Sequence, residues 1–271
     1  MQKIQFFIIL LIIFSIAGCA TTGTVKSIRQ AEGISEEGIA ASMSVKPGFH
    51  VRKRLTYLMA WNSIPIGSIV AEIGDIREYQ GRDVYVVTLV TRSNKFLSKI
   101  YNVEDTYITY IDTGTMTSRR YEADRKEGNY RKHVIVEYDF DKSEAIYTNL
   151  TDGSVKRCPI EKNVQDPLSV VCYFMTLPVK LGDKIGMTVN LNEKNYKLYG
   201  QIESVDIVKL PRLTSYPAFK IRPYAVLGNK RVKKGSGWMY FMAGKNRYPL
   251  YGVVWIPFGR VTSTLSKIED F

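Results

Sequence analysis

Residues 117–141, "TSRRYEADRKEGNYRKHVIVEYDFD", decide the fold class of this 271-residue chain. Polar side chains alternate with apolar or aromatic ones along two arms, and alternation with a period of two is typical of β-strands. The arms meet at Glu127-Gly128-Asn129, and a glycine among polar residues between two such arms is typical of a hairpin turn. We therefore expect an antiparallel hairpin in this stretch.

The same pattern continues on both sides of the hairpin. "EAIYTNL" and "SVKRCPI" predict a second hairpin about Thr151-Asp152-Gly153, because Asp-Gly is typical of a tight turn. Ten or more strands at short intervals, without an internal repeat, favour a strongly curved antiparallel sheet. Further strands are expected at 54–61, 66–76, 82–92 and 97–112, and then in several segments between 184 and 268.

The strand pattern changes once, in "VQDPLSVVCYFMTLPVKLGD" at 164–183. Asp166 as N-cap, Pro167 at the first helical position and Pro178 as the stop predict one helix. Its apolar face either fills the concave side of the sheet as ordinary core or leaves room for acyl chains, because methionine adapts its shape easily. Four residues spaced three to four apart would form this face: Leu168, Val171, Cys172 and Met175.

The first eighteen residues, "MQKIQFFIILLIIFSIAG", have the three parts of a secretory signal: a cation, a short apolar run and small residues. The run is shorter than the roughly 20 residues that a spanning helix needs. Ile16-Ala17-Gly18-Cys19 resembles the bacterial lipobox, in which the cysteine is acylated and becomes the mature N-terminus. We predict a lipoprotein signal peptide at 1–18 and a lipidated Cys19. The alternative is an ordinary signal peptide with an incidental cysteine.

Residues 19–47 hold this cysteine and then mainly small and polar side chains, which predicts a flexible tether. A single β-rich domain is expected at 48–271. Ala20 stands where aspartate would favour retention in the inner membrane. We therefore expect a lipid-anchored protein of the bacterial cell envelope, held by its acyl chains in the outer membrane and facing the periplasm.

The chain is basic, with 38 Lys and Arg against 26 Asp and Glu and a formal net charge of +12. Such a balance favours anionic partners, which in the envelope are phospholipid headgroups, lipopolysaccharide phosphates or acidic polymers. The alternative is that these cations only solvate the strand faces. The export signal argues against nucleic acid as a partner.

Four stretches, in this order, resemble unknown-function family 3108, a group of exported bacterial envelope proteins. The resemblance covers about residues 50–268 and depends on order and coverage, because no motif in it is catalytic. Relatives carry acidic residues in the turn after the strand of Trp238, where this chain has Ala243-Gly244-Lys245-Asn246. The stretches are "RLTYLMAWNSIPIGSIVAEI", "SKIYNVEDTYITYIDTGTMTSRRYEADRKEGNYRK", "QDPLSVVCYFMTLPV" and "GNKRVKKGSGWMYFMAGKNRYPLYGVVWIPFGRVTSTL".

This resemblance implies a mainly β fold, a half-barrel or open β-barrel-like sheet wrapped around one central helix. The architecture is similar to periplasmic lipoprotein carriers and mycobacterial lipid-binding lipoproteins, in which an incompletely closed sheet leaves a cavity for acyl chains. By this analogy, ten residues would line such a cavity: Tyr57, Trp61, Tyr107, Leu168, Val171, Cys172, Met175, Tyr199, Trp238 and Phe241. Cations at its mouth would hold an anionic headgroup: Arg119, Arg120, Lys230, Arg231, Lys233 and Lys234, with Arg131 and Lys132 as further candidates.

The residues of a catalytic or metal site are sparse. His50 and His133 lie far apart without nearby metal ligands, and the chain lacks a Gly-x-Ser-x-Gly elbow, a phosphate loop and a dinucleotide fingerprint. We therefore expect neither an enzyme nor a cofactor. Cys158 and Cys172 form either a disulfide or two free thiols. Three carboxylates stay open for an envelope hydrolase: Glu104, Asp105 and Asp166.

Two functional hypotheses follow. The first is a non-enzymatic envelope lipoprotein that binds or carries a lipid, or another amphiphile with an anionic head, in a curved-sheet cavity. The alternative is a scaffold or docking module for outer-membrane or cell-envelope assembly, with a protein partner.

Overall fold

The computed structural model describes residues 48–232 and 236–271. The predicted signal peptide (1–18), Cys19, the tether (19–47), Lys233 and Lys234 lie outside the described residues.

Fifteen strands form one sheet: β1 (Lys53–Trp61), β2 (Ile64–Tyr79), β3 (Arg82–Ser93), β4 (Glu104–Asp112), β5 (Ser118–Glu127), β6 (Tyr130–Asp139), β7 (Glu144–Asn149), β8 (Val155–Pro159), β9 (Lys184–Leu191), β10 (Lys194–Lys209), β11 (Ser215–Leu227), β12 (Lys230–Arg231), β13 (Ser236–Met242), β14 (Pro249–Ile256) and β15 (Gly259–Asp270). The helical segments are η1 (Leu97–Lys99) and α3 (Ser169–Thr176).

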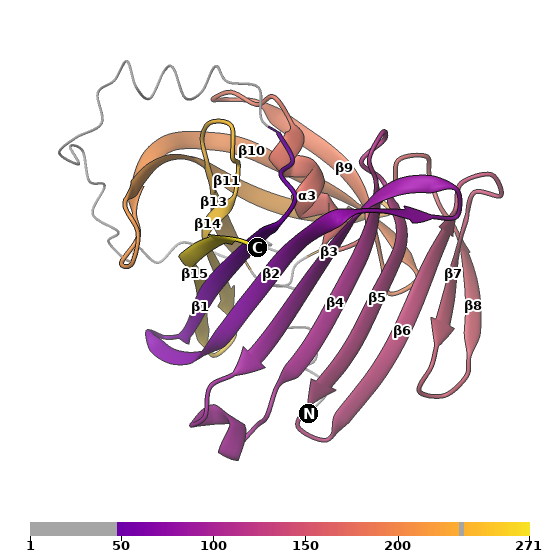
Figure 1. The fold of residues 1–271 in the computed structure, drawn as a ribbon, viewed down its shortest axis with the longest axis horizontal. Helices are drawn as coiled ribbons and strands as arrows, with labels where there is room; N and C mark the ends of the chain where they lie inside the picture. Colours follow the sequence, from indigo (N-terminus) through magenta and orange to yellow (C-terminus); the bar gives the residue numbers. More distant parts are fainter. Residues whose placement is uncertain (1–47, 233–235) are drawn as a thin grey trace.

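The sheet is antiparallel and follows the chain in an almost sequential order, with one rearrangement. The order is β8-β7-β6-β5-β4-β3-β2-β1-β15-β14-β13-β11-β10-β9, so the last strand lies beside the first. Figure 1 shows the sheet curving around α3 without closing into a barrel. The expected mainly β fold, an open and strongly curved sheet around one α-helix, is confirmed.

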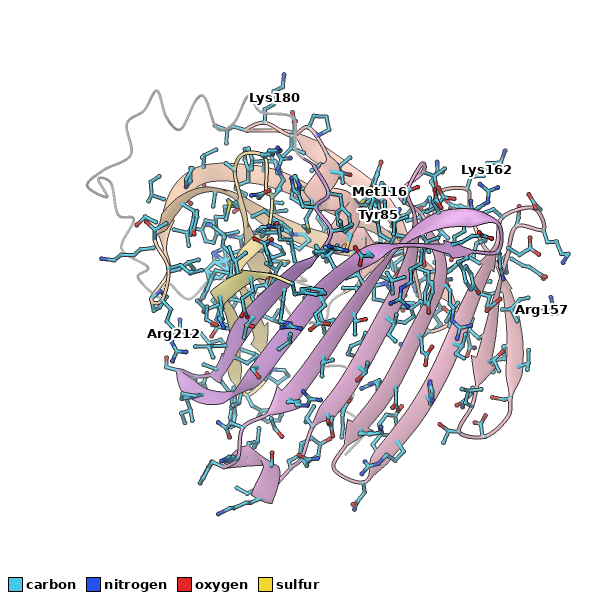
Figure 2. All side chains as sticks on the ribbon, in the orientation of Figure 1. Tyr85, Met116, Arg157, Lys162, Lys180 and Arg212 are labelled. Carbon is cyan, nitrogen blue, oxygen red and sulfur yellow. The ribbon has the colours of Figure 1, made fainter. Side chains whose placement is uncertain are left out.

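The two edge strands of the sheet, β8 and β9, do not pair with each other. We call the half of the sheet that ends in β8 the β8 arm and the half that ends in β9 the β9 arm. Figure 2 labels Arg157 on the β8 arm and Arg212, which follows β10, on the β9 arm. Gln165 pairs with Val189 of β9 through an isolated parallel bridge. Asn195 Nδ2 donates to the carbonyl oxygen of Pro159 at 2.7 Å. The edges are therefore joined by single contacts and not by a continuous backbone ladder.

The strands alternate in direction, so every second connection lies at the same end of the sheet. The connections β1–β2, β3–β4, β5–β6, β7–β8, β9–β10 and β14–β15 share the end that carries η1. We call it the η1 end, and the lower part of Figure 1 shows the first four of these connections. The backbone enters the described domain at the opposite end, where Phe271 N–H donates to the carbonyl oxygen of Arg52 at 3.2 Å.

The helix α3 begins two residues later than the sequence predicts, at Ser169, so its N-cap residue is Leu168, and Asp166 binds the start of the helix from two residues earlier. The Asp166 carboxylate accepts hydrogen bonds from the backbone N–H groups of Leu168 at 2.6 Å and Ser169 at 2.8 Å. Ser169 Oγ accepts in return from the backbone N–H of Asp166 at 2.8 Å. This reciprocal arrangement satisfies donors that the first helical turn leaves free.

The helix is buried on more than the predicted face. Leu168, Cys172 and Met175 are buried as expected, whereas Val171 is only half-buried. Val170 and Phe174 are also buried, and the Phe174 ring lies 4.4 Å from the ring of Phe241 on β13. A short helix surrounded by a curved sheet contacts strands on several sides, which explains the wider apolar surface. Within the described ranges, no helix is long and apolar enough to span a bilayer.

Gly67 on β2 marks a close approach between strands. It pairs with Ser93 of β3, and a Cβ at this position would overlap the backbone carbonyl oxygen of Arg92. We expect Gly67→Ala to lower the free energy of unfolding by about 2 to 3 kcal/mol, because the backbone of β3 has to move. Urea denaturation measures the loss. The control is Gly114→Ala, whose Cβ would meet Asp112 at an ordinary 3.4 Å, and equal stability of the two variants would contradict the prediction.

Candidate cavity on the concave face

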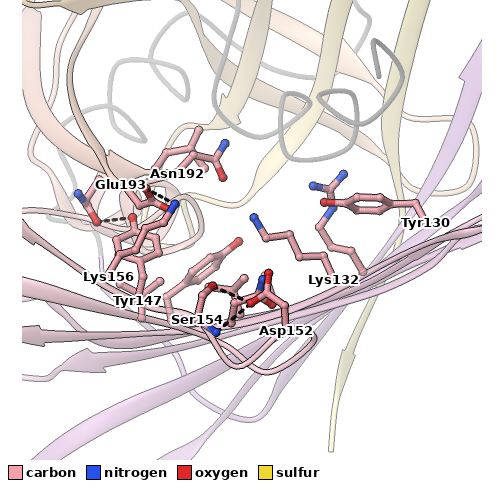
Figure 3. A pocket seen from close by; sticks show the side chains of 16 residues that line it. Tyr130, Lys132, Tyr147, Asp152, Ser154, Lys156, Asn192 and Glu193 are labelled. Atoms are coloured by element: carbon pink, nitrogen blue, oxygen red, sulfur yellow. Dashed lines mark hydrogen bonds and ion pairs between the residues drawn. The ribbon is translucent and has the colours of Figure 1, made fainter. Parts of the chain in front are cut away.

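A cavity of about 350 Å3 lies on the concave side of the sheet, between β5–β8 and the turn joining β9 to β10. Its volume is within the usual range for small-molecule sites. Asp152 and Ser154 from the β7–β8 connection and Asn192 and Glu193 from the β9–β10 turn line it, so it lies toward the η1 end (Figure 3). The cavity is therefore framed by elements from both arms of the sheet.

Cross-strand pairs of β5 and β6 form layers along this cavity. Because residues two apart point to the same face of a strand, alternate pairs face the cavity together. The inner layers are apolar and the layers nearer the η1 end are charged or phenolic. From the middle of the sheet to this end the pairs are Tyr121 with Val136, Ala123 with Val134, Arg125 with Lys132, and Glu127 with Tyr130.

Arg125 and Lys132 are two cations in directly opposite positions, an arrangement that destabilises a sheet when nothing offsets it. Arg125 Nε donates to Glu127 Oε1 at 2.9 Å, and its guanidinium lies 5.2 Å from the ring centre of Tyr130. Lys132 forms no ion pair with any residue that the structure describes. Figure 3 shows its ammonium group pointing into the cavity.

The opposite wall joins the two edges of the sheet through polar side chains. The Tyr147 hydroxyl donates to Asn190 Oδ1 at 2.6 Å, and Lys156 Nζ donates to Glu193 Oε1 at 3.0 Å. These contacts link β7 and β8 to β9 and the turn that follows it. They hold Lys156 on the cavity wall, so three cationic side chains surround the space.

Two buried carboxyl groups lie behind Arg125, those of Asp105 and Glu127. Asp105 accepts hydrogen bonds from the Lys126 backbone N–H at 2.8 Å and the Tyr107 hydroxyl at 3.1 Å. Glu127 accepts from the Arg125 guanidinium. Burial raises the pKa of both groups above the ordinary value, because an apolar environment disfavours their charged forms.

The raised pKa values predict a pH dependence of stability. A carboxyl group whose pKa is higher in the folded state stabilises the fold fully at low pH, and this contribution is lost as the pH rises through the folded pKa. Asn at position 105 keeps an acceptor for Lys126 N–H and has no charge to bury. We therefore expect Asp105→Asn to be more stable relative to the wild type at pH 8 than at pH 5. Urea denaturation at both pH values tests this, and an unchanged difference contradicts it.

The ten predicted cavity residues do not line the large cavity. Three of them, Val171, Tyr199 and Phe241, line a smaller apolar pocket of about 60 Å3 between α3 and β9–β13. Trp238 packs against Tyr240, Tyr251 and Trp255, on the face of β13 opposite to Phe241. Trp61 is 40% exposed at the η1 end. The remaining five residues are buried core: Tyr57, Tyr107, Leu168, Cys172 and Met175.

The predicted headgroup cations are not brought together. Arg119 pairs with Asp112 at 2.9 Å. Lys230 and Arg231 lie on β12, beside β11 on the other arm, where the Arg231 guanidinium lies 4.4 Å from the ring centre of Tyr224. Of the wider set, Lys132 lines the cavity, whereas Arg131 donates to the carbonyl oxygen of Gly128 at 2.7 Å.

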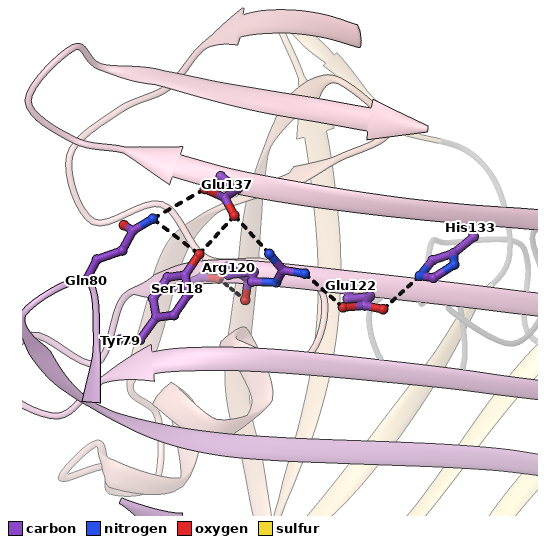
Figure 4. A network of polar contacts seen from close by, with 7 residues as sticks. All are labelled: Tyr79, Gln80, Ser118, Arg120, Glu122, His133 and Glu137. Atoms are coloured by element: carbon purple, nitrogen blue, oxygen red, sulfur yellow. Dashed lines mark hydrogen bonds and ion pairs between the residues drawn. The ribbon is translucent and has the colours of Figure 1, made fainter. Parts of the chain in front are cut away.

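Arg120 belongs to a polar network away from the concave side (Figure 4). Its guanidinium donates to Glu137 at 2.9 Å and to Glu122 at 3.1 Å, and His133 contacts Glu122 at 2.7 Å. Tyr79 donates its hydroxyl hydrogen to Glu137 at 2.9 Å. One acidic partner on the same strand, Glu122, and one on β6, Glu137, therefore neutralise this cation.

The remaining candidate residues, two cysteines and three carboxylates, do not form a common site. Cys158 and Cys172 are free thiols, so the disulfide alternative is not formed. Glu104 pairs with Arg92 at 3.0 Å on the surface, and the Asp166 carboxylate caps α3, so the three candidate carboxylates do not form one site. The turn Ala243-Gly244-Lys245-Asn246 accepts a hydrogen bond from Gly48 N–H at the Lys245 carbonyl oxygen, at 3.1 Å. The described residues hold no group of three metal-ligating side chains.

The sequence predictions missed Arg125, Lys156 and the phenols of Tyr130 and Tyr147. One signal was present: the hairpin at 117–141 places Arg125 opposite Lys132 when its strands are aligned on the Gly128 turn. Hairpin alignment could not identify Lys156 as a cavity residue. Its partner Glu193 lies 37 residues later in the chain, in the turn between β9 and β10.

Comparison with solved structures supports the architecture. A β-barrel-like protein of the domain of unknown function DUF1849 from Brucella abortus is 8% identical, with a TM-score of 0.56 over 82% of this chain and 98% of that chain. At this identity the likeness shows the fold alone.

Two further structures are similar at lower scores. A Bacteroides fragilis protein provisionally described as exported has 10% identity and a TM-score of 0.32, over 84% of this chain and 100% of that chain. A Parabacteroides distasonis protein provisionally described as a lipoprotein has 5% identity and a TM-score of 0.36, over 83% and 99%. Scores this low carry no argument about fold or function.

Among curated proteins, no significant match to this chain was found. The family described as "Protein of unknown function (DUF3108)" matches residues 56–266. This match covers most of the chain in one continuous stretch, so the protein belongs to the DUF3108 family.

Proposed function

We propose that this protein is a non-catalytic, lipid-anchored protein of the cell envelope that binds an anionic amphiphile in its concave cavity. One observation carries the proposal: Arg125 and Lys132 lie directly opposite each other and both face the cavity. Glu127 already pairs with Arg125, whereas Lys132 forms no ion pair within the described residues, so an anionic group in the cavity would be attracted chiefly by Lys132. Lys156 adds a third cation on the facing wall.

The gradient of polarity along the cavity supports an amphiphile over a small ion. The Tyr121–Val136 and Ala123–Val134 layers offer apolar surface deeper in the sheet, and the cations follow toward the η1 end. An alkyl chain would therefore lie inward, where its burial is favourable, and the anionic head would lie outward. The predicted leader and Cys19 support placement in the envelope, with the outer membrane as the proposed site.

The test compares three probes by isothermal titration of the purified protein. Dodecyl phosphate carries both the tail and the anion, dodecyl dimethylamine oxide has the same tail without net charge, and inorganic phosphate has no tail. We expect dodecyl phosphate to bind at least about tenfold more tightly than either of the others, since both halves of the cavity contribute. The proposal fails if dodecyl phosphate shows no binding below its micelle concentration, or binds no better than the amine oxide.

A docking module for envelope assembly is the competing function. Cross-linking in intact cells that traps one protein partner, together with no amphiphile in mass spectra of the membrane-extracted protein, would favour it. A retained anionic amphiphile in those spectra supports the cavity proposal.

A further inference from the structure

Large apolar side chains gather, exposed, at the η1 end of the sheet. Phe96 and Ile100, on either side of η1, are 71% and 75% exposed, and Phe258 in the β14–β15 turn is 74% exposed. Exposed apolar residues that occur singly need no explanation, but a group on neighbouring turns marks an interaction surface. We call the following six residues the apolar tips: Trp61, Ile64, Phe96, Ile100, Leu150 and Phe258.

Five of the six apolar tips come from adjacent elements of the sheet. Trp61 and Ile64 flank the β1–β2 turn, which lies beside the β14–β15 turn because β1 pairs with β15. Trp61 Nε1 donates to the carbonyl oxygen of Phe258 at 3.2 Å, which joins the two turns. The η1 segment follows β3, the next strand beside β2. Five of the tips are therefore neighbours at the η1 end of the sheet, and Leu150 lies farther along the same end, in the β7–β8 connection.

Cations accompany these tips. Lys95 precedes Phe96 and Lys99 precedes Ile100, both lysines are exposed, and neither forms an ion pair within the described residues. Alternating aromatic or aliphatic residues and lysines suit a bilayer interface, where apolar side chains enter the acyl boundary and ammonium groups meet anionic headgroups. The net charge of +12 favours the same surface. A protein partner would need a matching acidic and apolar groove, whereas a lipid surface adapts to several separate turns.

We propose that the η1 end docks onto an anionic phospholipid bilayer, with the apolar tips inserted at the boundary between headgroups and acyl chains. The cavity is lined by Asp152, Ser154, Asn192 and Glu193 from turns at this same end. Docking would therefore bring the cavity toward the membrane. This contact differs from the predicted acyl anchor on Cys19, because it uses only side chains of the described domain.

The test measures co-sedimentation with vesicles of phosphatidylglycerol and phosphatidylethanolamine. All proteins begin at residue 19 and carry Cys19→Ser, so that neither the apolar leader nor acylation contributes. Phe96→Ser/Ile100→Ser removes two tips, and the matched control Ile76→Ser/Leu181→Ser removes two apolar residues of 50% and 54% exposure away from the η1 end. We expect the tip variant to bind at least about fivefold more weakly and the control to bind like the parent.

A local measurement separates the tips from any other membrane-binding segment. Brominated phospholipids quench tryptophans at the bilayer interface, and Trp61 lies among the tips. Trp255 is also exposed at this end, whereas Trp238 is buried, so the comparison is made in a Trp255→Phe background. We expect quenching of the Trp255→Phe protein and its loss when Trp61→Phe is added. Equal binding of the tip and control variants, or no Trp61-dependent quenching, would overturn the proposal. A dimer that only the tip variant disrupts, without vesicle binding, would assign the surface to a second copy instead.

The tip variant is also titrated with dodecyl phosphate. Unchanged affinity shows that its cavity is folded, so a loss of vesicle binding reports on docking. If the parent binds vesicles through its tips but never binds dodecyl phosphate, the docking proposal stands and the cavity proposal fails.

Discussion

Lys132→Glu is expected to weaken the binding of dodecyl phosphate by about tenfold or more. Lys132 points into the cavity, lies opposite Arg125 and has no ion-pair partner within the described residues. Reversing its charge removes one attraction to the anionic head and adds a repulsion. The new carboxylate would also compete for Arg125 and Lys156. Isothermal titration at a fixed salt concentration measures the change.

The control for this prediction is Lys162→Glu, an equal change of net charge at an exposed position outside the cavity (Figure 2). It should leave the affinity for dodecyl phosphate within about twofold of the wild type, because distant surface charges are screened by salt. Lys132→Met should give an intermediate loss. If Lys132→Glu and Lys162→Glu bind dodecyl phosphate with equal affinity, the phosphate group does not lie near Lys132 on β6.

Asp166→Ala is expected to lower the free energy of unfolding by about 3 kcal/mol, the largest stability effect that we predict. Asp166 is fully buried, and its carboxylate caps the backbone N–H groups of Leu168 and Ser169. The hydroxyl of Thr109 on β4 donates to the other carboxylate oxygen. Alanine removes the cap and leaves a buried hydroxyl without this acceptor. Urea denaturation, followed by circular dichroism, measures the loss.

Two comparisons make this prediction specific. Asp166→Asn keeps one acceptor for the cap but places an amide toward Thr109 or the helix, so its loss should be smaller. Asp141→Ala, at an exposed position in the β6–β7 connection, should change the free energy of unfolding by less than about 0.5 kcal/mol. An Asp166→Ala protein as stable as Asp141→Ala would mean that neighbouring strands hold α3 without its cap.

The strands and the helix could be predicted because their signals are local. The turn at Gly128 has the left-handed φ of 53° that its sequence favours, and the strands on either side alternate as expected. The β1–β2 junction is shorter than the four residues that separate the expected strands at 54–61 and 66–76, because β2 begins at Ile64 and the turn consists of Asn62 and Ser63, with φ of 47° and 73°. Such angles at both central positions are typical of the two-residue turns that match strand twist.

The candidate site could be predicted only in part, because a cation's role depends on what lies opposite. Arg119 pairs with Asp112 at the end of β4, and Arg120 pairs with Glu122 on its own strand and with Glu137 on β6. A search for dense cationic sequence therefore selected arginines whose acidic partners lie away from the cavity. Lys132 differs because it lies on the concave side and faces open space.

By itself, the sequence determined the period-two strands, the single capped helix and the order in which adjacent hairpins pair. These depend on residues close together in the chain, through backbone pleat and turn geometry. Only the tertiary structure decided where space remains between side chains, because curvature brings the β9–β10 turn against β7 and β8 from the far edge of the sheet. The cavity and the Tyr147–Asn190 and Lys156–Glu193 contacts result from that long-range approach, and the pairing of β1 with β15 brings the β14–β15 turn beside the β1–β2 turn.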